Sequence, residues 1–253
     1  MPATVEMLCH YPVKGLSAQP LDQVTLHPGQ GFPLDRAFGF ARPGSGFDPE
    51  NPKPLPKGKF VVLARDAALA QLKTRYDDAS GKLTIDGQAF SANTPEGRRD
   101  AAARIAQHLG YTDDMVPTLQ SAGPHRFTDV SVVSPQMMNA ISLINIDSVT
   151  AFSETIGHQI SPARFRGNIL FSGMNPFEEL TLEARLIAIG EARLRVLRRT
   201  RRCPATEVNL ETGARDVDVP AALEEHYGHR DMGIYAEVIE GGRIAPGDAL
   251  TVL

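Results

Sequence analysis

Residues 193–216 read RLRVLRRTRRCPATEVNLETGARD, a strand-like pattern that runs into a cysteine. Apolar residues alternate with arginines over positions 194–197, which is typical of a half-buried strand. Pro204 cannot donate a hydrogen bond to a sheet, so we expect the strand to end at this point. The thiol of Cys203 should therefore lie at a sheet edge or loop mouth, where it can be reached from outside.

Arginine is frequent just before this thiol. The arginines are Arg193, Arg195, Arg198, Arg199, Arg201 and Arg202. Guanidinium groups close to a thiol favour the thiolate, which is the nucleophilic and metal-binding form, and they can also hold an anionic cofactor or substrate. Two plainer alternatives stay open: a lone cysteine is commonly a small buried apolar residue, and a run of arginines is commonly a solvated strand face. No partner motif of Cys, His or Asp lies nearby in the sequence to decide between them.

Two segments in the first part of the chain place cations at strand ends. Residues 11–15 read YPVKG, so Lys14 and Gly15 follow the end of the first expected strand. A glycine amide at such a turn can approach an anion closely. Residues 34–38 read LDRAF and place Arg36 just before another expected strand. The plain alternatives are a solvated ammonium for Lys14 and a salt bridge with its neighbours for Arg36.

A third segment, RFRGNI at residues 164–169, leads into a short apolar strand. Strand alternation would place Arg166 and Asn168 on the same face. A guanidinium beside an amide can bind a phosphate and the edge of a flat heterocycle, because together they offer several donors and an acceptor. Ordinary ion pairing would explain Arg166 equally well.

Taken together, these segments resemble the MOSC-domain proteins, the family named after the C-terminal domain of molybdenum cofactor sulfurase. In that family a loop carries Arg-Cys, then Thr, then Asp or Asn and a Thr-Gly turn. The matching residues here are Arg202, Cys203, Thr206, Asn209, Thr212 and Gly213. The segments at 11–15 and 34–38 resemble the family's N-terminal domain. The segment at 164–169, followed by PFEE at 176–179, resembles its Phe-Arg-Pro-Asn-Ile block, with Gly167 in place of the usual proline.

The resemblance implies an α+β fold that is mainly β: a smaller β-rich N-terminal MOSC-type domain over residues 1–115 and a β-barrel MOSC domain over residues 116–253. The 22 glycines and 19 prolines suit short strands and many turns. Local patterns predict hairpins at 82–90 and 185–200, and helices at 95–109, 148–157 and 220–227. They also predict a strand at 60–63 and a helix at 67–76.

The resemblance also implies a molybdenum enzyme that reduces N-hydroxylated compounds, as the mitochondrial amidoxime-reducing component and its bacterial counterparts do. On that pattern Cys203 is the catalytic residue and the protein ligand of molybdenum. The residues that would hold the Mo-pyranopterin cofactor are Lys14, Gly15, Arg36, Arg166, Asn168 and Arg202. Gly15 stands where some relatives have serine.

Electrons for such a reduction have to come from a separate protein, a ferredoxin or a reductase, because the sequence has no cysteine cluster for an iron–sulfur centre. Two alternative functions stay open. One is a carrier that holds sulfur or the cofactor on Cys203. The other is a barrel that only captures an anion.

The composition limits the classes of function and the cellular locations that are expected. The formal net charge of −4 argues against a general nucleic-acid binder. Cys9 and Cys203 are the two cysteines, so a disulfide framework is not expected and a reducing cytoplasm is the predicted location. We expect no membrane association, because neither a secretory signal nor an apolar stretch of about 18 residues is visible. Residues 42–59 contain five prolines and would form a loop that either covers the site or is a passive surface excursion.

Overall fold

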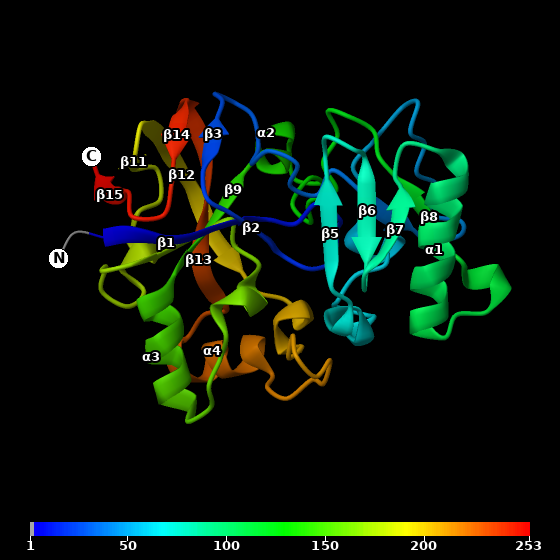
Figure 1. The fold of residues 1–253 in the computed structure, drawn as a ribbon. Coiled ribbons are helices and arrows are strands. Elements are labelled where there is room, and N and C mark those ends of the chain that lie inside the picture. Colours follow the sequence, from blue (N-terminus) through cyan, green and yellow to red (C-terminus); the bar gives the residue numbers. More distant parts are fainter. Residues whose placement is uncertain (1–2) are drawn as a thin grey trace.

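A closed seven-stranded β-barrel forms one half of the computed structural model, which describes residues 3–253 (Figure 1). Around the barrel the strands follow the order β1 (Ala3–His10), β15 (Ala249–Val252), β11 (Leu186–Ile189), β12 (Ala192–Arg201), β13 (Asp231–Glu240), β9 (Ile141–Asn145) and β10 (Ile169–Ser172). The ring closes because β10 also pairs with β1. Neighbouring strands are antiparallel, except that β9 and β10 are parallel.

Strand β12 illustrates how the sequence pattern builds the barrel. Ala192, Leu194 and Val196 are almost completely buried and belong to the barrel core. The alternate residues Arg193 and Arg195 are exposed on the outer surface. Each large apolar side chain buried in this way stabilises the fold by about 1.5–3 kcal/mol. The period of two in the sequence therefore fixes which face of β12 points inward.

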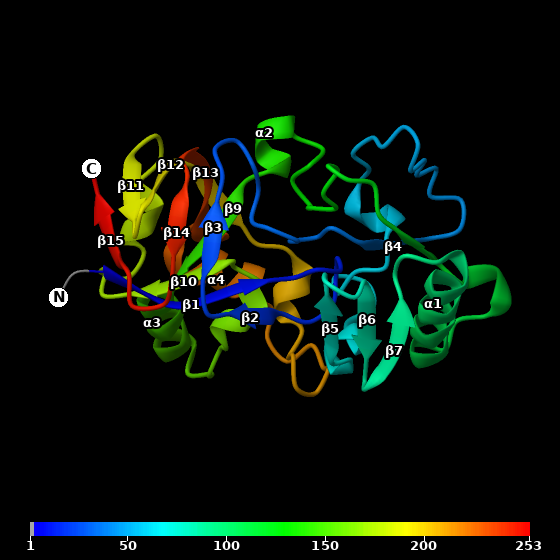
Figure 2. The same ribbon diagram turned by 45° about the horizontal axis from the view of Figure 1, so that its top comes forward.

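A separate β-rich unit lies beside the barrel (Figures 1 and 2). Its strands and helix are β4 (Gly39–Ala41), β5 (Thr74–Asp77), β6 (Lys82–Ile85), β7 (Gln88–Ser91), α1 (Pro95–Leu109) and β8 (Thr118–Gln120). Strands β5, β6 and β7 form one antiparallel sheet, and β4 pairs with β8. This unit has its own apolar core. Val208, from the loop that follows Cys203, packs into that core, so the loop is anchored on both halves of the molecule.

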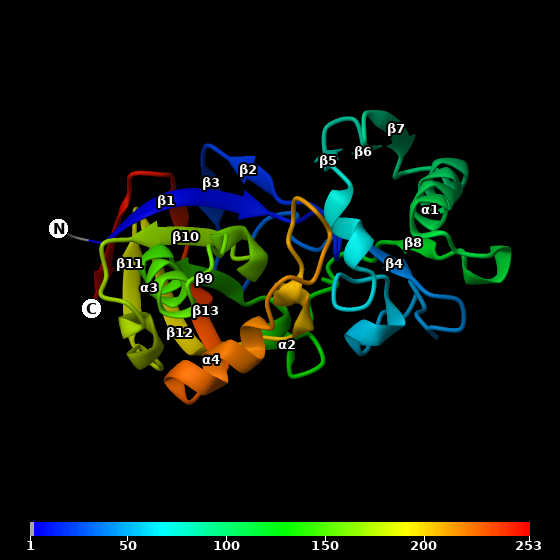
Figure 3. The ribbon, with the colours of Figure 1, turned by 90° about the horizontal axis from the view of Figure 1, so that it is seen from below.

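Helices α3 (Ile146–Ile156) and α4 (Val219–Tyr227) pack against the outside of the barrel (Figure 3). They meet it through buried residues such as Phe152 and Leu223. The short helix α2 (Pro135–Met138) contacts β13. None of the helices within residues 3–253 combines the length and the apolar character required to cross a membrane.

Three short strands complete the barrel half. Strand β2 (Gln19–Leu21) pairs with β1, and β3 (Val24–Leu26) pairs with β14 (Gly242–Ile244). The first three strands of the chain therefore pair with barrel strands or with C-terminal segments. The division of the chain at residue 115 stays a prediction.

The predicted fold class, α+β with a β-barrel, is confirmed. Two local predictions are wrong. Residues 60–63 form no strand, and only an isolated bridge links Phe60 to Ala41. Residues 67–76 hold a short 3-10 helix, Ala67–Gln71, followed by β5. The expected helix cap fails because the Asp66 carboxylate accepts hydrogen bonds from Arg42, Tyr111 and the Val62 amide instead.

Candidate functional site

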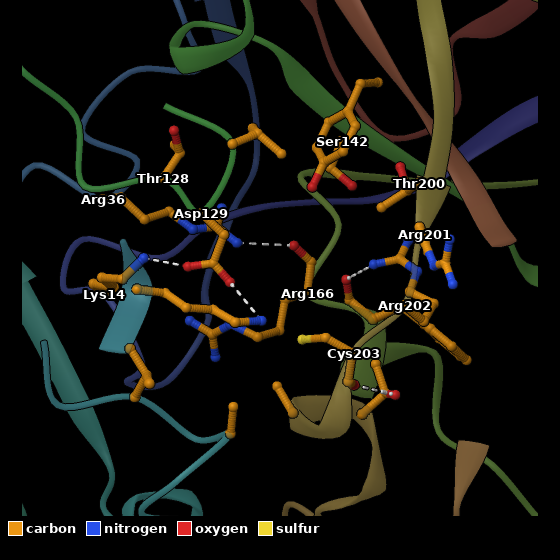
Figure 4. A pocket seen from close by; sticks show the side chains of 18 of the residues that line it. Lys14, Arg36, Thr128, Asp129, Ser142, Arg166, Thr200, Arg201, Arg202 and Cys203 are labelled. Atoms are coloured by element: carbon orange, nitrogen blue, oxygen red, sulfur yellow. Dashed lines mark hydrogen bonds and ion pairs between the residues drawn. The ribbon is translucent and has the colours of Figure 1, made fainter. Parts of the chain in front are cut away.

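A cavity of about 480 Å³ lies where the end of the barrel meets the second β-rich unit. It is lined by all of the predicted site residues, namely Lys14, Gly15, Arg36, Arg166, Asn168, Arg202 and Cys203. In Figure 4, Lys14 and Arg36 lie on one side, Thr200 and Arg202 on the other, and Cys203 lies between them. Segments far apart in the sequence therefore converge on one thiol.

Cys203 lies two residues beyond the barrel strand β12, which ends at Arg201, slightly before the end expected from Pro204. It is a free, half-buried thiol at the start of the 3-10 helix Pro204–Glu207. Its carbonyl accepts hydrogen bonds from the amide and the hydroxyl of Thr206, at 3.0 and 2.9 Å. These hydrogen bonds fix the backbone of Cys203, and its side chain faces the cavity.

The cysteine loop, residues 202–216, is held at its far end by an ion pair between the buried Arg164 and the partly exposed Asp216. Arg164, which is 4% exposed, donates to both carboxylate oxygens of Asp216 at 2.6 and 2.7 Å. Asn209 donates to the same carboxylate at 2.8 Å. The hydrogen bonds from Arg164 hold the pKa of Asp216 well below its usual range. The loop is therefore a rigid support for Cys203.

Arg202 also helps to hold the cysteine loop in place. Its Nε donates to the Met232 carbonyl at 2.8 Å, its Nη1 donates to the Phe165 carbonyl at 2.9 Å, and its Nη2 also bonds Met232. The guanidinium lies 5.2 Å from the centre of the Phe165 ring. Burial lowers the pKa of Arg202 to about 10. Because its donors are used by backbone carbonyls, Arg202 ties strands and loop together.

The arginine run before the thiol divides between the outer face of the barrel and the cavity. Four of its members line the cavity: Arg198, Arg199, Arg201 and Arg202. Arg193 and Arg195 form ion pairs with Glu240 and Glu237 on the exposed face of β12 and β13. Arg199 donates to the Leu180 carbonyl. The cavity opens at the end of the strand, so Arg193 and Arg195 lie away from the thiol, whereas the later arginines of the run line the cavity with it.

Further cations of the cavity come from other segments, and we call Lys14, Arg36 and Arg166 the cation face. Lys14 is 5% exposed, so the alternative of a solvated surface ammonium is wrong. Its Nζ donates to the Phe127 carbonyl at 2.8 Å and pairs with the Asp129 carboxylate. Burial lowers the pKa of Lys14, and the charge of Asp129 partly offsets this.

Arg36 and Arg166 lie on the ring of Tyr11, at 4.4 and 4.2 Å from its centre. Arg36 pairs with the buried Asp35, as the plain alternative expected, and also donates to the Arg166 carbonyl at 3.1 Å. Both arginines have positive φ, 49° and 54°, a conformation that is costly for residues other than glycine. Backbone strain of this kind is common at functional sites.

Arg166 retains an unused donor. Its Nη1 donates to the Leu16 carbonyl at 2.8 Å, whereas its buried Nη2 has no partner within residues 3–253. Burial, and then the nearby charge of Arg36, lower the pKa of Arg166 to about 10. A buried charged donor without an acceptor is unfavourable by about 1–3 kcal/mol or more. An anionic group in the cavity would remove this cost.

Two predicted cofactor-binding residues have a clear structural role. Gly15 has φ 83°, and a Cβ at this position would lie 3.0 Å from the Val61 carbonyl oxygen. Asn168 is 1% exposed; its Oδ1 accepts from the Ser142 amide at 3.1 Å, and its Nδ2 donates to the Cys9 carbonyl at 3.3 Å. The amide of Asn168 therefore joins β1 to β9 and has little capacity left for a ligand.

The cavity residues that the sequence analysis missed include Lys57, Asp129 and Tyr235. Lys57 belongs to the proline-rich segment 42–59, and its Nζ lies 3.9 Å from Asp129. Although burial opposes its charge, the Cys203 side chain and Asp129 raise the pKa of Lys57. The segment therefore adds a cation to the cavity and is more than a passive excursion. Its turn-rich sequence has no periodicity that could have indicated this.

The residues present fit an anionic, sulfur-coordinated cofactor. Cys203 offers a soft sulfur ligand, and the cation face offers charge and the unpartnered Nη2 of Arg166. Within residues 3–253, no group of three or more His, Cys, Asp or Glu side chains is arranged to bind a metal ion.

The MOSC domain family model matches residues 122–251, more than half of the chain. The chain therefore belongs to the MOSC-domain family, which is associated with binding of the molybdenum cofactor. No curated protein matches it.

The solved structures that match the chain are more distant. YiiM from Geobacillus stearothermophilus is 21% identical over 45% of this chain and 53% of its own, with a TM-score of 0.36. The YuaD protein from Bacillus subtilis is 17% identical over 100% of this chain and 96% of its own, with a TM-score of 0.49. YiiM from Escherichia coli is 17% identical over 53% of this chain and 58% of its own, with a TM-score of 0.33. The match thus spans little more than half of either YiiM chain.

Proposed function

We propose that this protein is a molybdenum-cofactor oxidoreductase that reduces N-hydroxylated compounds, with Cys203 as the protein ligand of the metal. The observation that carries the proposal is the meeting of a half-buried free thiol and a buried cation face in one cavity. Family membership supports the association with the molybdenum cofactor. The resemblance to amidoxime-reducing proteins supports the substrate class.

Different residues of the chain would hold different parts of the cofactor. Cys203 would supply a thiolate to the metal from a loop that the Arg164–Asp216 pair keeps rigid. Lys14, Arg36 and Arg166 would bind the anionic part of the pterin, and the open Nη2 of Arg166 would gain its missing acceptor. Gly15 keeps its backbone close to Val61 at this wall, and Asn168 and Arg202 hold the surrounding strands in register.

When bound, the cofactor would supply the two-electron redox chemistry. Overall, an N-hydroxylated compound takes up two electrons and two protons, its N–O bond breaks, and an amine or amidine and water leave. The protein's part is to position the substrate beside Cys203 and to exclude bulk water from the cavity. Asp129 lies at the cavity between Lys14 and Lys57. Although burial raises the pKa of Asp129, the charges of Lys14 and Lys57 lower it below the usual value, so the carboxylate stays ionised and holds the two ammonium groups in place.

The electrons would come from a separate ferredoxin or reductase. Cys9, the other cysteine of the chain, is buried and its thiol donates to the Gly167 carbonyl at 3.1 Å, so it is not available to carry electrons at the surface. Both cysteines are free thiols, as is usual in a reducing cytoplasm, and we include a cytoplasmic location in the proposal.

The test is to purify the protein from a host that makes the cofactor and to quantify molybdenum and oxidised pterin. We expect close to stoichiometric amounts of both, and turnover of benzamidoxime with a chemical reductant. Cys203→Ser should lose turnover while its melting temperature stays near that of the wild type. Absence of molybdenum from the wild-type protein would contradict the proposal.

A carrier function is the second candidate, favoured by the presence of Lys57 and the Cys203 thiol in the same cavity. A cation at this place would stabilise a persulfide anion as well as a thiolate. A native mass that shows one added sulfur atom on Cys203, without molybdenum or pterin, would favour the carrier.

A further inference from the structure

Three hydroxyl groups line the same cavity without any hydrogen-bond partner. They belong to Ser142, Thr200 and Tyr235, and we call them the hydroxyl triplet. Ser142 and Thr200 are 5% and 2% exposed, and their hydroxyl oxygens are buried and unpartnered within residues 3–253. Buried hydroxyl groups are normally satisfied, so two open ones at one cavity indicate a place for a ligand.

The hydroxyl of Tyr235 is open as well. No hydrogen bond to it exists among residues 3–253, although the side chain lies within electrostatic range of Asp129 and Cys203. A tyrosine that is largely buried ordinarily directs its hydroxyl at a partner. Burial raises the pKa of Tyr235, so the hydroxyl keeps its proton and can donate.

The barrel itself brings the triplet together. Ser142 lies on β9, Tyr235 on β13 and Thr200 on β12, which are three consecutive strands. Ser142 and Tyr235 are direct partners in the β9–β13 register, so their side chains emerge on the same face. Thr200 lies at an irregularity in the β12–β13 pairing, where the bulged strand turns its side chain toward the cavity.

The hydroxyl triplet is distinct from the cation face. In Figure 4, Ser142 and Thr200 lie on the barrel side, away from Lys14 and Arg36. A cation favours an anion, whereas a hydroxyl both donates and accepts and so suits an uncharged group with donors and acceptors of its own. An amidoxime head group, with its N–OH and NH₂, has this character.

We infer that the hydroxyl triplet is the substrate subsite, which binds the uncharged N-hydroxylated head group while the cation face holds the anionic cofactor. The inference rests on the proposed function for the identity of the substrate class. Ser142 and Thr200 act as fixed hydrogen-bonding groups, because both are buried on barrel strands. Tyr235 provides the third contact.

The test measures binding of benzamidoxime to the purified protein by calorimetry, together with its molybdenum content. Ser142→Ala, Thr200→Val and Tyr235→Phe should each raise the dissociation constant by between about twofold and tenfold, the effect of losing one neutral hydrogen bond. O-methylbenzamidoxime, which lacks the hydroxyl proton, should lose less affinity in at least one of the variants. Their molybdenum content should equal that of the wild type.

Tyr227→Phe is the matched control, because this tyrosine lies on α4 outside the cavity and its hydroxyl pairs with Thr155. It should bind benzamidoxime like the wild type. Tyr235→Phe breaks no hydrogen bond within the protein, so it should fold normally even if the buried serine or threonine variant does not.

Wild-type protein that does not bind benzamidoxime would overturn the inference, and so would three variants that bind it with unchanged affinity. Equal losses for benzamidoxime and its O-methyl derivative in every variant would also overturn it, because they would indicate a general distortion. A wild-type protein without molybdenum defeats the proposed function instead, while the binding series still decides on the subsite.

Discussion

Arg166 and Arg202 both line the cavity and have similar surroundings, but they have different roles. Each guanidinium lies on an aromatic ring, at 4.2 Å from the Tyr11 ring for Arg166 and at 5.2 Å from the Phe165 ring for Arg202. Burial lowers the pKa of both to about 10. The donors of Arg202 are used by backbone carbonyls, whereas Nη2 of Arg166 is open.

This contrast extends to the regions that carry them. The cysteine loop is a support, closed by internal hydrogen bonds around the Arg164–Asp216 pair. The cation face is a binding surface that holds strained backbone and an unsatisfied charge. A cationic side chain is therefore available to a ligand only where the protein provides too few hydrogen-bond acceptors for its donors. The number of arginines nearby does not decide this.

Of the substitutions that test the different roles of the two arginines, Arg202→Met should have the largest effect. It should lower the free energy of unfolding by about 3 kcal/mol or more, since it leaves the carbonyls of Phe165 and Met232 without donors. Urea unfolding at neutral pH measures the change. A variant as stable as the wild type would show that Arg202 is not a structural tie.

Gly15→Ala should have the next largest effect and tests the backbone of the cavity wall. The positive φ of 83° and the 3.0 Å approach to the Val61 carbonyl both disfavour a side chain here. We expect a loss of about 1–3 kcal/mol in unfolding free energy. Gly87→Ala is a useful control, because it has φ 84° and open space around it, so it isolates the conformational part of the cost.

Arg166→Met tests whether Arg166 binds a ligand and contributes little to stability. It removes the hydrogen bond to the Leu16 carbonyl and the contact with the Tyr11 ring, but also an unpartnered buried donor and a like charge beside Arg36, so stability should change by less than about 1 kcal/mol. Affinity for pyrophosphate should fall by about tenfold in protein made without the cofactor. A large loss of stability with unchanged anion affinity would reverse the roles assigned to the two arginines.

The smallest expected effect concerns the acid stability of the cysteine loop. The folded pKa of Asp216 lies below its unfolded value, so its contribution is present above about pH 4 and is lost as the pH falls below that. Asp216→Asn should therefore be less stable than the wild type at pH 7, and the difference should shrink in acid. Thermal melts from pH 7 to pH 3 would reveal a constant difference if the ion pair did not matter.

Much of the barrel could be predicted from the sequence, because period-two patterns such as Leu194 and Val196 on β12 need only local alternation. The thiol at the end of that strand followed from Pro204 in the same way. The failures at residues 60–63 and 67–76 have a tertiary cause. Asp66 could cap a helix in isolation, but Arg42 and Tyr111 take its carboxylate in the folded protein.

The candidate site was less predictable. Lys14, Arg36 and Arg166 were indicated by the family resemblance, and the structure brings them to one cavity with Cys203. The arginine run before Cys203 was a mixed signal, because Arg193 and Arg195 turn outward while its later members line the cavity. Lys57 and Tyr235 had no local signal, since their role comes from contacts between segments far apart in the sequence.

X-ray absorption at the molybdenum edge tests the central claim most directly, by counting the sulfur atoms around the metal in wild-type protein and in Cys203→Ser. The account predicts that the variant loses the contribution of one sulfur and gains an oxygen neighbour. An unchanged sulfur count would contradict it, because the Cys203 thiolate would then not be a ligand of the metal.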